Sequence, residues 1–342
     1  MSAKTHAEGK LFEHPNLRRF TALMPVATLF LIFAGALVTS HDAGLSVPDW
    51  PTSYGYHMFS FPVSLWIGSI FFEHGHRIIA SCVGMLTVVL VFWVSLVETR
   101  RAVRILSFTA LFAVCLQGVL GGMTVLLGLP ASVSVGHALL AQAFLVILVV
   151  IAYSQSKEWF SRRDVKASSG EEKFFPLAMG ACAVVYTQLF LGAVMRHTGS
   201  GLAVLDFPTV GGSLLPGFDA ALLAGINSDR ALLGMGQVTI SQVWIHFAHR
   251  VGAVVVTLYL GYLSYRILSV KNLPSRVTNS ALSVISLVLL QFALGVYTVL
   301  SLRSPWVASL HVVTGALLLV ACVLLALRCY PIQSSVERKH ES

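Results

Sequence analysis

Long apolar runs separated by short polar segments dominate this sequence. Each run contains roughly 20 or more predominantly apolar residues, which is enough for an α-helix to cross a hydrocarbon core of about 30 Å. We predict membrane-spanning helices over residues 20–39, 74–97, 105–127, 134–155, 174–197, 242–265, 277–301 and 306–328. The first run follows a basic segment, so a cleaved signal peptide is the competing interpretation. Its length, and an equivalent helix opening the second half of the chain, favour a span.

The composition leads to the same conclusion. Of the 342 residues, 56% are hydrophobic and only 11% are charged, whereas a soluble domain has about 25% charged residues. A chain so poor in charge cannot cover a surface that faces water. The expected solvent is therefore mostly the lipid bilayer, and the fold class is an all-α polytopic membrane protein.

Positive charge alternates along the chain. The formal net charge is +8, yet residues 40–73 and 123–156 contain no Lys or Arg. Because cytoplasmic loops of membrane proteins are enriched in Lys and Arg, this pattern predicts an even number of spans and two cytoplasmic termini. The charge is explained by membrane topology, and we expect no nucleic-acid partner.

The two halves of the chain repeat each other. The segment GALVTSHDAGLSVPDWP (35–51) matches GAVMRHTGSGLAVLDFP (192–208), and LQGVLGGMTVLLGLPASVSVGH (116–137) matches LQFALGVYTVLSLRSPWVASLH (290–311). Four spans per half predict a parallel repeat, with two four-helix bundles related by a pseudo-twofold axis along the membrane normal. We place the N-terminal bundle at 1–155, a cytoplasmic linker at 156–173 and the C-terminal bundle at 174–342.

Four histidines occupy repeated positions near the outer ends of alternate spans. They are His76 and His137 in the first half, and His249 and His311 in the second. Ionisable residues within a membrane are costly, so they are functional candidates. Two imidazoles can ligate a haem iron from opposite sides, and cofactor sites of helix bundles use side chains from facing helices. Interfacial histidines bonded to carbonyl groups, or one four-histidine metal site, are the alternatives.

Small and basic residues accompany these histidines. Ala80 and Ala253 lie one turn below His76 and His249, and Gly118, Gly121, Gly122 and Gly295 line the intervening helices. Such residues suit a flat ligand, but they also permit close helix packing. Arg77 and Arg250 follow their histidines directly. Pairing with haem propionates and snorkelling to the outer interface are equally weighted interpretations of these two arginines.

One carboxylate breaks the repeat. Glu73 precedes His76 by three residues and shares its helix face, whereas the matching residue in the second half is His246. This asymmetry suggests that one site performs chemistry and the other serves it. An interfacial glutamate solvated by headgroups is the alternative.

The remaining polar candidates have simpler interpretations. Asp49 and Asp206 are flanked by turn residues, which predicts that they shape the outer loops. We expect His41, His57, His74 and His197 to be solvated or interfacial. The five cysteines lie within predicted spans or at their ends, where they act as small hydrophobes.

These motifs together resemble the haem A synthase family. The resemblance rests on GLSVPDWP, EHGHR, LQGVLGGMTVLLGLP with His137, RHTGSGLAVLDFP, IHFAHR, and LGVYTVL with His311, and it extends from about Leu31 to Leu325. It departs from some bacterial members in one respect, since residues 40–72 contain no cysteine pair. A redox role for such a pair is therefore absent here.

The resemblance implies a function and a division of labour. The protein would oxidise the C8 methyl group of haem O to a formyl group, making haem A for terminal oxidases. By motif match, His76 and His137 would ligate the substrate haem O, and His249 and His311 would ligate a haem b cofactor. Glu73 matches the family's functionally important carboxylate and is the catalytic candidate. Haem O synthase is the partner that the resemblance implies for substrate delivery.

Two other function classes compete with this enzyme. A di-haem b electron-transfer subunit would bind haem without modifying it. A parallel-repeat transporter is disfavoured, because no span is clearly broken near its midplane. In each case we expect an integral protein of the bacterial plasma membrane, with the haem sites near the outer face. The oligomeric state stays open, a homo-oligomer included.

Overall fold

The computed structural model describes residues 14–164 and 170–332. Parts of the predicted terminal segments, at residues 1–13 and 333–342, lie outside the described residues. The same is true of residues 165–169 in the predicted linker. Eight long helices make up most of the described chain: α2 (Pro15–Ser40), α3 (Gly68–Val97), α4 (Arg101–Leu126), α5 (Ala131–Ser154), α7 (Phe175–His197), α9 (Ile240–Leu268), α10 (Ser275–Leu300) and α11 (Pro305–Cys329). Shorter elements complete the chain: the helices α6 (Lys157–Asp164) and α8 (Ala220–Leu232), and the 3₁₀ turns η1 (Met58–Ser60), η2 (Val63–Leu65) and η3 (Glu171–Phe174).

The predicted all-α class and the eight spans are confirmed. In the described residues, eight helices are long and apolar enough to cross a membrane. Their ends differ from the prediction by a few residues, most at α3, which begins at Gly68 rather than at residue 74. Local sequence explains several of the ends. Proline opens α11 at Pro305, and Thr239 and Gln242 form a capping box at the start of α9.

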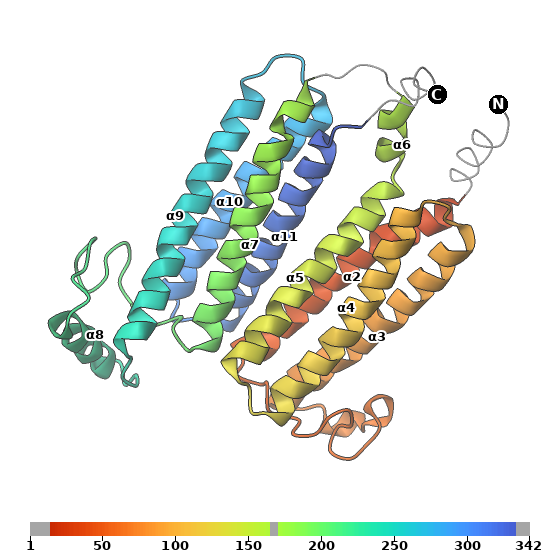
Figure 1. The fold of residues 1–342 in the computed structure, drawn as a ribbon. Coiled ribbons are helices and arrows are strands. Elements are labelled where there is room, and N and C mark those ends of the chain that lie inside the picture. Colours follow the sequence, from red (N-terminus) through yellow and green to blue (C-terminus); the bar gives the residue numbers. More distant parts are fainter. Residues whose placement is uncertain (1–13, 165–169, 333–342) are drawn as a thin grey trace, which may run out of the picture.

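The long helices form two rings of four (Figure 1). In the first half, α2 contacts α3, α3 contacts α4, α4 contacts α5, and α5 contacts α2. In the second half, α7, α9, α10 and α11 close a ring in the same order. The halves meet through α2 with α11, α5 with α7, and α5 with α11. The equivalent helices are α2 and α7, α3 and α9, α4 and α10, and α5 and α11. If each helix is replaced by its equivalent, the same set of contacts results, which is consistent with a pseudo-twofold axis between α5 and α11.

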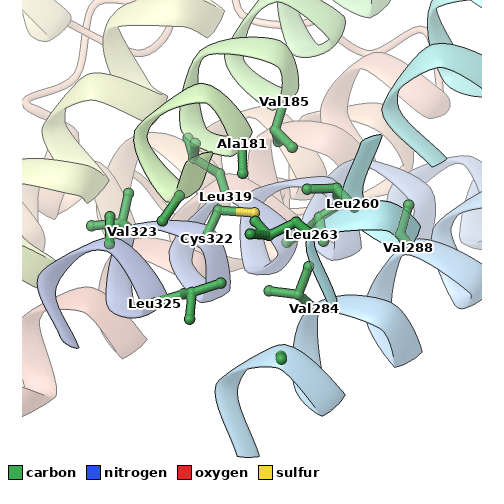
Figure 2. Close-up of a cluster of buried hydrophobic side chains, with 14 of the residues drawn as sticks. Ala181, Val185, Leu260, Leu263, Val284, Val288, Leu319, Cys322, Val323 and Leu325 are labelled. Atoms are coloured by element: carbon green, nitrogen blue, oxygen red, sulfur yellow. The ribbon is translucent and has the colours of Figure 1, made fainter. Parts of the chain in front are cut away.

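Each ring encloses an apolar core. Figure 2 shows the core of the second ring, where Ala181 and Val185 of α7 meet Leu260 and Leu263 of α9, with Cys322 of α11 buried among them. Leu145 and Val149 of α5 belong to the same buried cluster, so the core continues across the junction between the halves. The five cysteines, all within the described residues, are free thiols, as expected.

The outside of the helices is apolar as well. Phe92, Phe112 and Leu258, from three different helices, are each more than 60% exposed. Large apolar side chains at this exposure fit a surface that faces lipid rather than water. The bundle is therefore apolar both inside and outside, as the composition requires.

The loops before α3 and around α8 lie at the same end of the bundles, opposite α6 (Figure 1). This is the end that the charge pattern predicts to be outer. Near it, Arg196 of α7 donates through Nη2 to the Ala36 carbonyl (2.7 Å) and to Ser40 Oγ (3.0 Å) of α2. Ser309 of α11 donates to the same Ser40 hydroxyl (3.0 Å). Polar contacts thus join the halves close to the candidate site residues.

Candidate functional site

The four repeated histidines lie near the loop-bearing ends of α3, α5, α9 and α11. Within each ring, the two imidazoles are close enough to interact electrostatically, His76 with His137 and His249 with His311. The described residues contain no group of three or more His, Cys, Asp or Glu that could hold a metal ion. Within the described residues, the four histidines therefore do not form one cluster that could hold a metal ion.

A glycine on the preceding helix makes room for each histidine. A Cβ added to Gly35 would lie 2.9 Å from His76 Cε1, and one added to Gly121 would lie 3.3 Å from His137 Cε1. In the second ring, the same construction at Gly192 and at Gly295 gives 3.1 Å to the imidazole of the facing histidine. A Cβ at Gly35 would force the His76 imidazole to shift, and one at the other three positions would require a smaller movement of the facing imidazole. The glycines therefore fix where the rings can lie.

The polar atoms of the histidines fit a ligand at iron. The Nδ1 atoms of His76, His137 and His311 are buried and have no hydrogen-bond partner. Isolated buried polar atoms are costly, and a histidine that ligates a metal through one nitrogen usually donates from the other. Two facing imidazoles per ring, each seated against a glycine, form a donor set suited to a six-coordinate haem.

Arg77 and Arg250 hold the outer loops. Arg77 donates to the carbonyl groups of Asp49 (2.7 Å), Thr52 (3.0 Å) and Val47 (2.8 Å). Arg250 makes the equivalent contacts to the carbonyl groups of Thr209 (2.9 Å) and Asp206 (2.8 Å). Both guanidinium groups are thus engaged with loop backbone. Contact with haem propionates stays a prediction. Only the guanidinium N–H groups that do not bond the loop backbone could make it.

Glu73 is buried, with only 4% of its surface exposed. Its Oε1 accepts from Arg77 Nη2 (2.7 Å), and its Oε2 accepts from the Val47 N–H (2.8 Å). The carboxylate is therefore not solvated by headgroups, because helix α3 and the first outer loop enclose it. Both of its oxygens have a partner in the protein.

The matching position in the second ring has no acid. His246 is buried, and its Nδ1 has no hydrogen-bond partner. Among the described residues, Arg250 has no ion pair like that of Arg77 with Glu73, although the Asp206 carboxylate is near enough to interact with it. The second ring thus has no counterpart of the carboxyl group that pairs with Arg77 in the first.

Asp49 and Asp206 shape their loops, as predicted. Asp49 accepts from the N–H groups of Tyr54 (2.7 Å) and Gly55 (2.9 Å), and Asp206 accepts from those of Gly211 (3.1 Å) and Gly212 (3.0 Å). Burial alone would raise the pKa of each carboxyl group, but these hydrogen bonds outweigh it, so each pKa lies below its usual value. Both loops thus form around a charged carboxylate.

The expectation for His74 is wrong. This residue is fully buried rather than solvated or interfacial, and its Nδ1 lies 3.0 Å from Ser53 Oγ. The rings of Phe61 and Trp66 pack on it at centroid distances of 4.6 Å and 4.7 Å. The first outer loop folds back over the start of α3, which a sequence pattern does not reveal. By contrast, His57 is exposed, as expected.

Three glutamines near the histidines were not singled out from the sequence. Gln117 donates to the His137 carbonyl (3.0 Å), Gln188 to the His249 carbonyl (2.9 Å), and Gln291 Nε2 lies 3.4 Å from His311 Nε2. Each lies four residues before one of the histidine-facing glycines. That spacing was present in the sequence, and the Leu-Gln pair that opens the repeated blocks at 116 and 290 was the available signal.

The glycine contact gives a first testable prediction, with a control on the same helix. Gly121 faces His137, whereas Gly118, one turn away, has nothing within 4 Å of an added Cβ. Overpacking costs about 1–3 kcal/mol, so Gly121→Val should weaken haem binding in the first ring by roughly tenfold or more. Gly118→Val should leave it unchanged. Haem content per purified chain, from cells that make haem O, measures both. Equal retention by the two variants would show that Gly121 does not set the position of His137.

Comparison with known proteins gives a consistent result. A sequence profile of the family described as cytochrome oxidase assembly protein matches residues 60–323. The haem A synthase of Shewanella oneidensis is 28% identical over 328 residues, covering 92% of this chain and 96% of that protein. The haem A synthase of Halalkalibacterium halodurans is 27% identical, covering 93% and 96%. That of Symbiobacterium thermophilum is 31% identical over 257 residues, covering 72% and 74%.

Proposed function

The chain belongs to the cytochrome oxidase assembly protein family, and from this premise we propose how its two histidine pairs divide the work of the family's reaction. The protein is an integral membrane oxidoreductase that converts haem O to haem A, the activity for which several full-length relatives are named. This reaction oxidises a methyl group of the porphyrin to a formyl group. Haem O is therefore its substrate.

The first ring is the proposed substrate site. His76 and His137 would ligate the iron of haem O, since they form the pair that has a buried carboxylate beside it. His76 is three residues from Glu73, and Glu73 is held by Arg77 and the Val47 N–H. The loop that Arg77 and Asp49 fold covers this end of the ring and would keep water from the porphyrin edge.

The second ring is the proposed cofactor site. His249 and His311 would hold a haem b, which supplies one-electron chemistry when bound. His246 replaces the acid in this ring, so no carboxylate at that position can accept protons. The single observation that carries the division is this exchange of Glu73 for His246 between the two rings.

Glu73 is the proposed proton acceptor near the substrate. Oxidation of a methyl group to an aldehyde takes up an oxygen atom, which a water molecule admitted to the site would supply, and releases protons together with electrons, so a positioned base assists such a step. A buried carboxylate paired with an arginine can take a proton only if its pairing changes. The role of Arg77 would then be to hold the charged form of Glu73 in place between turnovers.

The second candidate function is a di-haem electron-transfer subunit that does not modify its haems. Two sites with two histidines each would suit this function as well as they suit the enzyme. The experiment that separates them is mass spectrometry of the haems extracted from purified protein after expression with haem O. Haem A, or an oxidised intermediate of haem O, supports the proposed enzyme. Unmodified haem alone supports the carrier.

Topology is a further prediction. We propose that both termini are cytoplasmic, that the histidine pairs lie toward the outer face of the bacterial plasma membrane, and that haem O synthase delivers the substrate. Reporter fusions after Lys173 and at the C-terminus should indicate the cytoplasm, and fusions near Gly212 should indicate the outer compartment, because Lys and Arg cluster on the cytoplasmic side. An outer C-terminus would contradict the parallel orientation of the halves.

A further inference from the structure

Four helix pairs in this protein repeat one arrangement. In each pair, the first helix carries a glycine against which the histidine of the second helix packs: α2 with α3, α4 with α5, α7 with α9, and α10 with α11. The residue four positions before that glycine lies one turn away on the same face. In three pairs it is a glutamine, and in α2 it is Leu31.

Each glutamine reaches the histidine of its partner helix. Gln188 Nε2 lies 3.1 Å from His249 Nδ1 and donates to the His249 carbonyl (2.9 Å). Gln117 bonds the His137 carbonyl, and Gln291 reaches the His311 ring. The glutamine thus ties the helix that carries the glycine to the backbone or ring of the ligand residue itself.

Unused hydrogen-bonding capacity remains on both sides. The Oε1 atoms of all three glutamines are buried without a partner, as are the Nδ1 atoms of His137 and His311. The amide nitrogens of Gln117 and Gln188 donate to the main-chain carbonyl groups of His137 and His249. Each of these glutamines therefore holds the backbone of its histidine at a fixed distance from the helix that carries the glycine.

Leu31 removes this contact at one histidine only. Gly35 lies against the His76 imidazole as Gly121, Gly192 and Gly295 lie against those of their histidines, so the helix geometry is preserved. What differs is the side chain, since leucine can neither donate nor accept a hydrogen bond. His76 is therefore the one histidine of the four without a side-chain amide from the neighbouring helix.

We propose that Gln117, Gln188 and Gln291 are positioning residues for the histidine ligands, and that Leu31 makes His76 the ligand from which haem is released. This inference rests on the proposed function, in which the first ring must exchange substrate for product while the second keeps its haem. Outer contacts to a metal-ligating histidine typically contribute about 10–100-fold in affinity. The second ring has two such glutamines and the first has one, so the second ring should hold its haem more tightly than the first.

The test is the rate at which haem leaves the full-length protein. Protein purified with both haems is mixed with apomyoglobin as the haem acceptor, and transfer is followed by absorbance. In the wild type we expect one haem to leave quickly and the other slowly. Leu31→Gln should slow the fast phase by roughly tenfold or more, and Gln291→Leu should speed the slow phase by about 10–100-fold.

Matched variants separate positioning from packing. Leu31→Met keeps an apolar side chain of similar size and should leave the fast phase unchanged. Gln188→Glu keeps the size of the side chain but cannot donate to the His249 carbonyl, so it should speed the slow phase as Gln291→Leu does. It should also change the electron paramagnetic resonance spectrum of that haem, because the plane of the imidazole is no longer held in place. If Leu31→Gln fails to fold, Gln117→Leu tests the same ring and should speed the fast phase.

The outcomes distinguish this inference from the proposed function. Variants of Leu31, Gln117 and Gln291 that all release haem at wild-type rates would overturn the inference, even if replacement of the histidines abolishes haem binding. Retention of both haems after replacement of the histidines would instead overturn the ligand assignment of the proposed function. The shifts described above, in the stated directions, support the inference.

Discussion

Glu73→Gln should leave both haems bound and lower haem A formation by about 10²–10⁴-fold, which is the usual contribution of a positioned base. Glutamine has nearly the shape of glutamate and can still accept the Val47 N–H, but it carries no charge and is a poor proton acceptor. Binding should survive because the histidines that would hold the haems are unchanged. A partly oxidised haem O should accumulate if the variant stalls between the methyl and formyl stages.

The structure requires a control for this variant, because Glu73 also pairs with Arg77 inside the protein. Breaking a buried ion pair by removing one partner typically costs about 3–5 kcal/mol, so a disturbed loop could lower activity without any role in proton transfer. Arg250 holds the second loop in the same way, but in the described part of the chain it has no ion pair like that of Arg77 with Glu73. Arg250→Met therefore measures the effect of losing the contacts between an arginine and its loop. Arg77→Met removes the same kind of loop contacts and, in addition, the ion pair with Glu73.

The measurement is the haem profile of cells that express each variant in the absence of the terminal oxidase, together with the thermal stability of purified protein. A loss of haem A in Glu73→Gln at wild-type stability and haem content supports the proton role. A normal amount of haem A in this variant would show that Glu73 only holds the first loop in place and takes no part in proton transfer. Loss of both haems would make it structural, and the proposed role would fail in that case too.

His249→Ala and His311→Ala should each abolish the stable b-type spectrum, because each would remove one of the two axial ligands of the cofactor haem. The interaction of the two imidazoles within one ring, and the glycine seat of each, motivate this expectation. The first-ring site should remain, so haem O binding should persist. Haem A formation should nevertheless stop, because the electron carrier is missing.

Two comparisons make this prediction specific. His57→Ala changes an exposed loop histidine and should retain both haems. His76→Ala and His137→Ala should retain the b-type spectrum and lose the substrate haem. Absorbance and haem extraction per chain measure each case. An unchanged b-type spectrum in both second-ring variants would remove His249 and His311 as ligands.

The sequence by itself determined the eight spans and the repeat, and it supplied the residues that we propose for both sites. The length of each apolar run sets a membrane helix, because every backbone polar group in lipid must be satisfied within the helix. The roles of Asp49 and Asp206 also followed from sequence, since each carboxylate bonds N–H groups only five or six residues further on.

Only the tertiary structure decided what surrounds those residues. The burial of Glu73 depends on Val47, and that of His74 depends on Ser53. The seat of His76 depends on Gly35 of another helix, and the amide at His249 comes from Gln188. The physical reason is that these contacts join segments about 20 to 60 residues apart, whose relative position is set by how helices and loops pack. Helix periodicity fixes the face on which a side chain lies, but packing decides which partner meets it.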